Sequence, residues 1–217
     1  MSDAVSGAPD AGTAPEWLRN LADAATRMEV PRYLRPPVSG GRQSAVLVLF
    51  GEGPRGPDLL YIQRSAGLRH HPGQPAFPGG GLEEGDGSPE ETALREAVEE
   101  TGLRPSGVDV VSRLPELFII RSQNRVIPVL AWWREPSAVR AADIGEVAAV
   151  ERIPVAALAD PANRFMLRGP SGYLGPGFAI GSMLIWGFTG MLTDRLLALA
   201  GWERPWDHNV TRELPAG

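Results

Sequence analysis

Residues Gly79 to Leu103 read GGGLEEGDGSPEETALREAVEETGL, and this stretch is the most informative part of the chain. It contains eight acidic residues, namely Glu83, Glu84, Asp86, Glu90, Glu91, Glu96, Glu99 and Glu100, and a single basic residue, Arg95. Because like charges gathered on a loop and one short helix repel one another, we expect a counter-charge here. Oxygen ligands suit hard divalent ions, so the stretch predicts a site for Mg²⁺ or Mn²⁺.

Start and stop signals bound a short helix inside this stretch. Ser88 is a good N-cap, Pro89 suits the first helical position, and Glu91 completes a capping box. Gly102 suits a left-handed residue that ends a helix. The spacing therefore predicts a helix that begins at Ser88 or Pro89 and ends at Thr101.

The helical repeat places the carboxylates of Glu96, Glu99 and Glu100 on one face, within reach of a common point. We expect the opposite face, with Leu94, Ala97 and Val98, to pack on the core. Arg95 borders the carboxylates, and we expect it to hold one of them by a forked hydrogen bond. The preceding loop, Pro78–Gly79–Gly80–Gly81, lets backbone atoms approach a ligand closely. A solvated acidic helix is the alternative, but the i+4 neighbour of Glu96 is Glu100 rather than a base.

The stretch resembles the Nudix box, whose pattern is G-x5-E-x7-R-E-U-x-E-E-x-G-U with U an apolar residue. Residues Arg95 to Leu103 match its second half position by position. The first half departs from the pattern, because Asp86 stands where the box has its first glutamate and one extra residue precedes Arg95. The resemblance implies an α/β/α sandwich with a mixed β-sheet and a metal-dependent hydrolase of nucleoside diphosphate derivatives.

The preceding segment, LLYIQRSAGLRHHPGQPAFPGG from Leu59 to Gly80, is similar to the signature of the coenzyme A pyrophosphatase branch. That signature runs L-L-x-x-R-S-x3-R-x3-G-x3-F-P-G-G, and this chain has one extra residue before Arg64. The resemblance implies hydrolysis of the diphosphate linkage of coenzyme A to adenosine 3′,5′-bisphosphate and 4′-phosphopantetheine.

The resemblance also assigns roles to residues. Metal binding is expected at Glu96, Glu99, Glu100 and a carbonyl of Gly79 or Gly80, and catalysis at these glutamates with Arg95. Substrate binding is expected at Arg64, Arg69, His71, Phe77 and Gly80, although Phe77 alternatively packs in the core. The general base is left open: it is one of these carboxylates, another carboxylate that the sequence does not identify, or a residue of the loop from Ile120 to Arg125.

Composition narrows the classes of function. The chain has 217 residues, no cysteine and a formal net charge of −5. It can form one domain, expected at 15–206 between an N-terminal disordered tail at 1–14 and a flexible tail at 207–217. The missing cysteines exclude disulfides, thiolate metal sites and a cysteine nucleophile. The acidic charge argues against non-specific nucleic-acid binding.

No secretory signal is visible, so we expect a cytoplasmic protein. The segment from Gly169 to Thr193 has no charged residue and is long enough to cross a membrane, but its prolines and glycines argue against a span. We expect instead a strand at 178–180 and a helix from Met183 to Ala200 capped by Ser182. Tryptophans near the C-terminus suggest a homodimer.

The other expected elements are a helix at 15–28, strands at 45–50, 58–63, 108–114, 116–121, 125–133 and 146–152, and a short helix at 154–158. Three functions remain open. The first is a coenzyme A diphosphatase. The second is a Nudix hydrolase acting on another nucleoside diphosphate derivative, such as ADP-ribose or NADH. The third is a catalytically silent nucleotide-binding module, which would be expected to have lost one of the three glutamates.

Overall fold

The computed structural model describes residues 13–68, 71–169 and 172–214 of the chain. The helices are α1 (Glu16–Thr26), α2 (Pro89–Thr101), α3 (Val155–Leu158) and α4 (Gly187–Leu199), with short 3-10 turns η2 (Arg32–Leu34), η3 (Pro105–Gly107) and η4 (Pro161–Asn163). The strands are β1 (Arg42–Gly53), β2 (Gly56–Arg64), β3 (Pro75–Ala76), β4 (Gly79–Gly81), β5 (Val108–Arg113), β6 (Leu117–Ile119), β7 (Asn124–Trp133), β8 (Val147–Pro154), β9 (Arg164–Arg168), β10 (Leu174–Ile180), β11 (Met183–Ile185) and β12 (Thr211–Glu213).

The strands form two sheets. The larger is eight-stranded and mixed, with the path β3-β2-β1-β7-β5, and with β4 beside β1, β6 beside β7 and β8 beside β2. The long central strands β1 and β7 are parallel, whereas β1 and β2 form an antiparallel hairpin. The smaller sheet has the order β11-β10-β9-β12.

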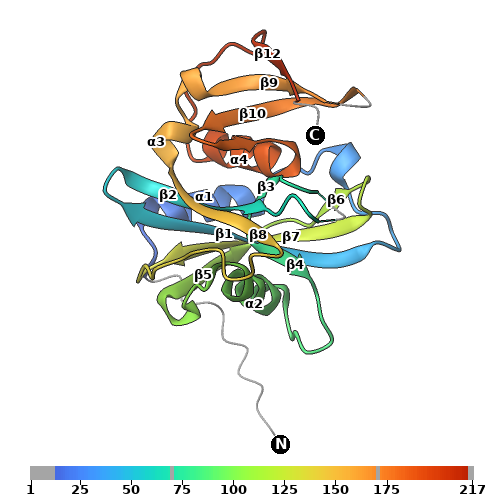
Figure 1. The fold of residues 1–217 in the computed structure, drawn as a ribbon, viewed down its shortest axis with the longest axis vertical. Coiled ribbons are helices and arrows are strands. Elements are labelled where there is room, and N and C mark those ends of the chain that lie inside the picture. The colour runs from blue at the N-terminus through green and yellow to red at the C-terminus, as the bar shows by residue number, and fades with distance from the viewer. Residues whose placement is uncertain (1–12, 69–70, 170–171, 215–217) are drawn as a thin grey trace, which may run out of the picture.

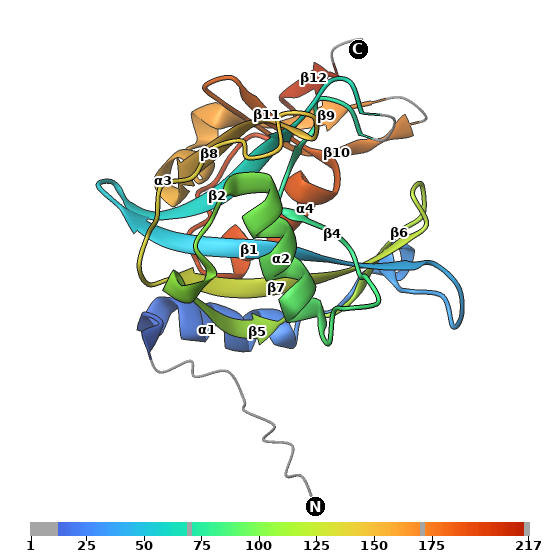
Figure 2. The same cartoon turned by 60° about the horizontal axis from the view of Figure 1, so that its bottom comes forward.

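Helices cover both faces of the larger sheet, as the sequence predicts for an α/β/α sandwich. Helix α2 lies on one face and α1 and α4 on the other, with the smaller sheet beyond α4 (Figure 1). The turned view brings α2 in front of β1 and β7 (Figure 2). Alternation along β1 explains the two cores, because Leu47 and Leu49 join the α2 side while Val48 and Phe50 join the α1 and α4 side.

The predicted boundaries of α2 are confirmed. The Glu91 N–H donates to Ser88 Oγ at 3.2 Å, and Gly102 ends the helix with φ 68°. The expected core face is confirmed at Ala97, which is buried, and at Leu94, which is half-buried and packs on the core. Val98 is half-buried, whereas Ala93, which was not expected on this face, is buried. Glu100 is buried as well, at 2% exposure. One carboxylate of the expected polar face thus lies on the buried side of the helix.

The strands expected along β1, β2, β5, β6, β7 and β8, and the helices at α1 and α3, are confirmed. The expected helix at Met183–Ala200 is wrong at its start. Met183–Ile185 form β11, which pairs with β10 after a reversal at Gly181, where φ is 58°. The backbone groups of these residues are used by the sheet, so α4 begins only at Gly187, and Ser182 does not cap it.

Both expected tails differ from the structure where it describes them. Residues 1–12 lie outside the described part, but Ala14, at the end of the expected N-terminal tail, is 2% exposed. Thr211–Glu213, inside the expected C-terminal tail, form β12 and pair in parallel with β9. In the described part of the chain, no helix is both long enough and apolar enough to cross a membrane.

Candidate active site

The site forms where β4 packs against the C-terminal half of α2. β4 pairs with β1 through Ala45–Gly80 and Val46–Gly79, so the expected glycine loop is a short strand. The Gly79 N–H donates to Glu100 Oε2 at 2.9 Å. This bond and the burial of its side chain fix Glu100 at the junction of strand and helix.

Glycine is required at position 79, where a side chain would meet backbone, and a side chain at position 80 would displace Glu96. A Cβ added at Gly79 would lie 2.3 Å from the Ala45 carbonyl oxygen. A Cβ added at Gly80 would lie 2.3 Å from Glu96 Oε1. The second contact shows that Glu96 occupies the space left by the missing side chain of Gly80.

Arg95 organises the exposed side of the site. Its Nε and Nη2 form a fork with Asp86 Oδ1 and Oδ2 at 3.1 and 3.0 Å, so the fork is made to Asp86 and not, as expected, to one of the three helix glutamates. The same guanidinium also contacts Glu96 Oε1 and Glu99 Oε2, both at 3.1 Å. Asp86 is thus a positioning residue: it holds the arginine that in turn holds two glutamates.

Further bonds secure Asp86. Its Oδ2 accepts from Thr92 Oγ1 at 2.9 Å and from the Glu83 N–H at 3.0 Å. The Arg95 hydrogen bonds, followed by that backbone bond, hold the pKa of Asp86 well below its ordinary value. The carboxylate therefore stays ionised and ties the loop before α2 to the helix.

The two inner glutamates are electrostatically unusual. Burial raises the pKa of Glu100 to about 8, although the Gly79 N–H and Arg64 oppose the shift. Burial also raises the pKa of Glu96, opposed mainly by Arg95. Ionising both carboxylates together therefore requires additional positive charge, which agrees with the counter-charge inferred from the sequence. Glu99 differs, because its side chain is 57% exposed.

Glu146 is a residue that the sequence reasoning missed as part of the site. Its charge raises the pKa of both Glu96 and Glu100. β8 pairs with β2 opposite Arg64, and the Ser65 N–H donates to the Glu146 carbonyl at 2.8 Å. The only signal in the sequence was an acidic residue at the start of an expected strand, which says nothing of its partner strand.

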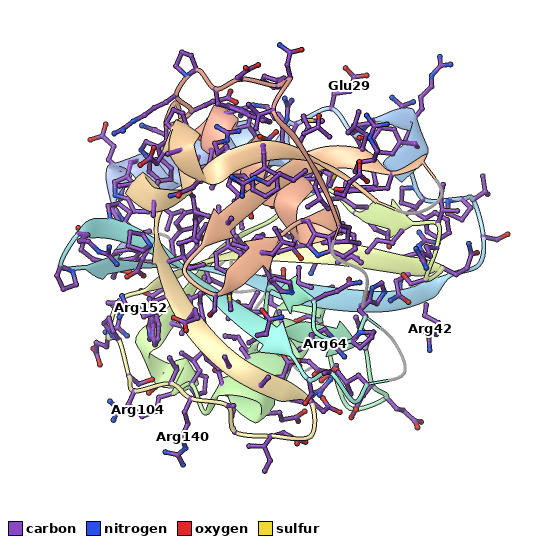
Figure 3. All side chains as sticks on the ribbon, turned by 45° about the horizontal axis from the view of Figure 1, so that its top comes forward. Glu29, Arg42, Arg64, Arg104, Arg140 and Arg152 are labelled. Carbon is purple, nitrogen blue, oxygen red and sulfur yellow. The ribbon has the colours of Figure 1, made fainter. Side chains whose placement is uncertain are left out.

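Arg64 is the substrate-binding candidate that the structure brings to the carboxylates. Its Nη1 lies 3.8 Å from Glu100 Oε1, and the side chain is 24% exposed. The Nε is buried and has no hydrogen-bond partner among the described residues. Arg64 stands at the end of β2, far from Arg152 of the paired strand β8 (Figure 3).

The structure does not bring the other expected substrate-binding side chains to the carboxylates among the residues that it describes. Arg69 lies outside the described residues. His71 is exposed, and its Nδ1 lies 2.9 Å from Gln74 Oε1. Phe77 is 2% exposed and stacks on Tyr61 with ring centroids 5.0 Å apart, so its assignment to substrate binding is wrong and the packing alternative is right.

The loop expected as a second source of the general base offers no acid. Residues 120–125 contain no aspartate or glutamate. Arg125, at its end, is held by Glu116 through bonds of 2.9 and 2.7 Å.

The donor set fits a hard divalent cation. The half-buried Glu96 and the buried Glu100, whose pKa values are raised, provide oxygen ligands beside the backbone of Gly79 and Gly80. Within 13–68, 71–169 and 172–214, no three acidic or histidine side chains are already gathered as a metal-binding group. The joint ligation by Glu96, Glu99 and Glu100 thus stays a prediction.

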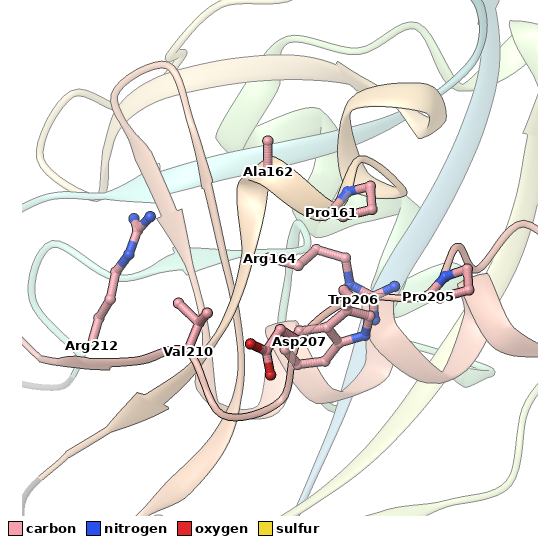
Figure 4. Close-up of a pocket in the computed structure, with 8 residues that line it drawn as sticks. All are labelled: Pro161, Ala162, Arg164, Pro205, Trp206, Asp207, Val210 and Arg212. Carbon is pink, nitrogen blue, oxygen red and sulfur yellow. The ribbon is translucent and has the colours of Figure 1, made fainter.

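A surface cavity of about 630 Å³ lies elsewhere, between η4, β9 and the C-terminal segment (Figure 4). Its deepest charged residue, Arg164, is paired with Asp194 and Glu203 and stacks on Trp206 at 4.6 Å. These contacts attach the segment after α4 to the smaller sheet. We interpret the cluster as structural.

Comparison with known proteins identifies relatives of this chain. The family model described as the NUDIX domain matches residues 41–169. An uncharacterized Nudix hydrolase NudL of Escherichia coli K12 is 40% identical over 140 residues, covering 63% of this chain and 70% of the relative. One of Pectobacterium atrosepticum, of the same name, is 47% identical over 112 residues, covering 51% and 57%.

Solved structures with a similar fold include an Ap4A hydrolase binary complex of C. elegans, with 20% identity and a TM-score of 0.44, covering 52% of this chain and 80% of that one. The NUDIX domain of Shewanella oneidensis NrtR complexed with ADP ribose has 23% identity and a TM-score of 0.44, covering 54% and 75%. Likenesses of this size carry no argument about substrate.

Proposed function

The chain belongs to the Nudix family of hydrolases, and from this premise we propose that its substrate is coenzyme A or a derivative of it. Water would be added across the diphosphate linkage, giving adenosine 3′,5′-bisphosphate and 4′-phosphopantetheine. One observation carries the proposal: Arg64, from the segment similar to the coenzyme A signature, lies 3.8 Å from Glu100, from the Nudix box.

That contact means that the signature segment borders the catalytic carboxylates instead of lying elsewhere on the surface. β2 ends at Arg64, and β3 and β4 then return the chain to α2. Coenzyme A has a 3′-phosphate in addition to its diphosphate. A cation in this segment therefore supplies charge for phosphate groups beyond what divalent ions neutralise.

We assign Glu96, Glu99 and Glu100 as ligands of divalent cations. When bound, such ions neutralise the diphosphate oxygens and lower the pKa of a nearby water molecule. Arg95 orients Glu96 and Glu99 through the contacts described above. Gly79 holds one oxygen of Glu100 with its N–H and leaves the other facing Arg64.

We assign Glu146 as the general base that takes the proton of the attacking water. It is the carboxylate outside the box whose charge acts on both Glu96 and Glu100. A carboxylate that holds a metal is a poor base, so a separate carboxylate near the same site suits the role of general base. The cytoplasmic location and the homodimer stay predictions.

A substrate panel tests the assignment. The purified protein is incubated with Mg²⁺ or Mn²⁺ and with coenzyme A, ADP-ribose or NADH, and the products are separated and identified by mass. We expect release of adenosine 3′,5′-bisphosphate from coenzyme A to be the fastest reaction. If ADP-ribose or NADH is cut while coenzyme A stays intact, the chain acts on another nucleoside diphosphate derivative.

A further inference from the structure

Two arginines lie beside the carboxylates expected to bind metal, but they are held very differently. Arg95 is fixed by its fork to Asp86, by Glu99 and by the Gly81 carbonyl at 3.1 Å. Arg64 has one charged contact, with Glu100, and a buried Nε without a partner among the described residues. Arg95 is thus held in one position by several partners. The guanidinium of Arg64 is held by fewer contacts and can exchange one partner for another.

The two oxygens of Glu100 are also different. Oε2 accepts the 2.9 Å hydrogen bond from the Gly79 N–H, which keeps the carboxylate in place. Oε1 faces Arg64 Nη1 at 3.8 Å, a separation beyond ordinary hydrogen-bond length. The attraction at Oε1 is electrostatic, and a small rotation of the Arg64 side chain would end it without disturbing the backbone.

We propose that Arg64 and a divalent cation compete for Glu100 Oε1, and that Arg64 transfers to a phosphate of the substrate when the cation binds. This inference rests on the proposed function. Arg64 is then a positioning residue that couples metal binding to substrate binding. One carboxylate oxygen cannot closely hold two cations without strong repulsion between them, and a phosphate offers the guanidinium a better-matched partner.

The backbone of Arg64 is anchored, and this allows its guanidinium to move while the rest of the residue stays in place. Its N–H donates to the Gln74 carbonyl at 3.0 Å, and β2 pairs with β8 on the other side. The strand register shifts between Gln63 and Arg64, which marks an irregularity in the ladder at this residue. The backbone of Arg64 is therefore anchored at the rim of the site, while its side chain remains 24% exposed.

Competition makes a prediction that a purely structural role does not. Removing Arg64 should strengthen metal binding, because a rival cation is lost, and weaken phosphate binding, because a ligand is lost. Linkage requires the reciprocal effect, so a bound phosphate ligand should raise metal affinity more in the wild type than in the variant. A structural defect would weaken both kinds of binding.

Calorimetric titration of Mn²⁺ tests the competition without measuring turnover. Variants Arg64→Ala, Arg64→Gln and Arg64→Lys are compared with the wild type, and a thermal melt of each variant verifies folding. We expect Arg64→Ala and Arg64→Gln to bind Mn²⁺ about fivefold tighter or more, and Arg64→Lys to stay near the wild type. In the presence of EDTA, both neutral variants should bind adenosine 3′,5′-bisphosphate more weakly.

Arg113→Ala is the matched control. Arg113 pairs with Glu90 at the start of α2, outside the site, so the loss of Arg113 should leave Mn²⁺ affinity unchanged. Weaker or unchanged Mn²⁺ binding in both neutral Arg64 variants would overturn the proposal. Because the titration involves no hydrolysis, failure to cleave coenzyme A would reject the substrate and leave the competition result standing.

Discussion

The Gly79 N–H donates to Oε2 of Glu100 at 2.9 Å, joining the glycine strand to the helix across 21 residues of sequence. This bond engages one oxygen of the buried glutamate, while the other oxygen faces Arg64. It also explains why β4 and α2 act together: a change in either element moves the same carboxylate.

Substituting this glutamate should stop the reaction while keeping the fold. Glu100→Gln preserves the acceptor for the Gly79 N–H but removes the charge, so we expect hydrolysis to fall about 100-fold or more. Glu99→Gln should also lower turnover by orders of magnitude. Glu90→Gln, on the same helix but paired with Arg113, is the control. Full activity in Glu100→Gln and Glu99→Gln would reject their assignment as metal ligands.

Gly80→Ala should impair the site through one methyl group. The added Cβ would lie 2.3 Å from Glu96 Oε1, so this carboxylate must move. We expect kcat to fall about 100-fold, as for other small displacements of catalytic groups. Gly81→Ala is a matched control, since the nearest atom to its Cβ is the Gln43 carbonyl oxygen at 3.9 Å. Equal activity of the two variants would contradict the steric argument.

Asp86→Ala should release Arg95 and with it Glu96 and Glu99. The variant loses the fork and the acceptor for Thr92. We expect a lower melting temperature and about a 10- to 100-fold loss of activity. Glu84→Ala, in the same loop but exposed, should resemble the wild type. A Glu84→Ala variant as impaired as Asp86→Ala would show that loop composition, not the fork, matters.

The stability of the protein in EDTA should fall as pH rises. The pKa of Glu100 is about 8 in the folded chain, against an ordinary 4.5. Between these values the folded state keeps a proton that the unfolded state has lost, so the free energy of unfolding decreases with pH. Thermal melts across this range should show a flatter slope for Glu100→Gln. A variant slope equal to that of the wild type would refute the shifted titration.

Glu146→Gln should mainly affect the chemical step. Loss of a general base lowers rate by about 100-fold or more, so we expect a reduced kcat with KM little changed. Glu146→Asp should recover part of the rate, because it retains a carboxylate. Steady-state kinetics of both variants measure this. A Glu146→Gln enzyme with wild-type kcat would leave one of the helix carboxylates as the base.

The local elements were predictable because their signals lie within a few residues. Ser88, Glu91 and Gly102 set the ends of α2 through bonds made inside the helix and its caps. The hairpin of β1 and β2 followed from an apolar run on each side of a glycine-rich turn. The start of α4 was misplaced, because pairing with β10 turned Met183–Ile185 into a strand that helix-capping signals cannot reveal.

The charge and spacing of the α2 glutamates were predictable from the residues alone, because the helical repeat is a local property of the backbone. The tertiary structure alone shows that Asp86 holds Arg95, that Phe77 is buried, that Arg64 contacts Glu100, and that the charge of Glu146 acts on Glu96 and Glu100. The last of these depends on the pairing of β2 with β8, strands more than eighty residues apart. Such pairing is selected by the packing of the whole sheet, so residue spacing along the chain does not record it.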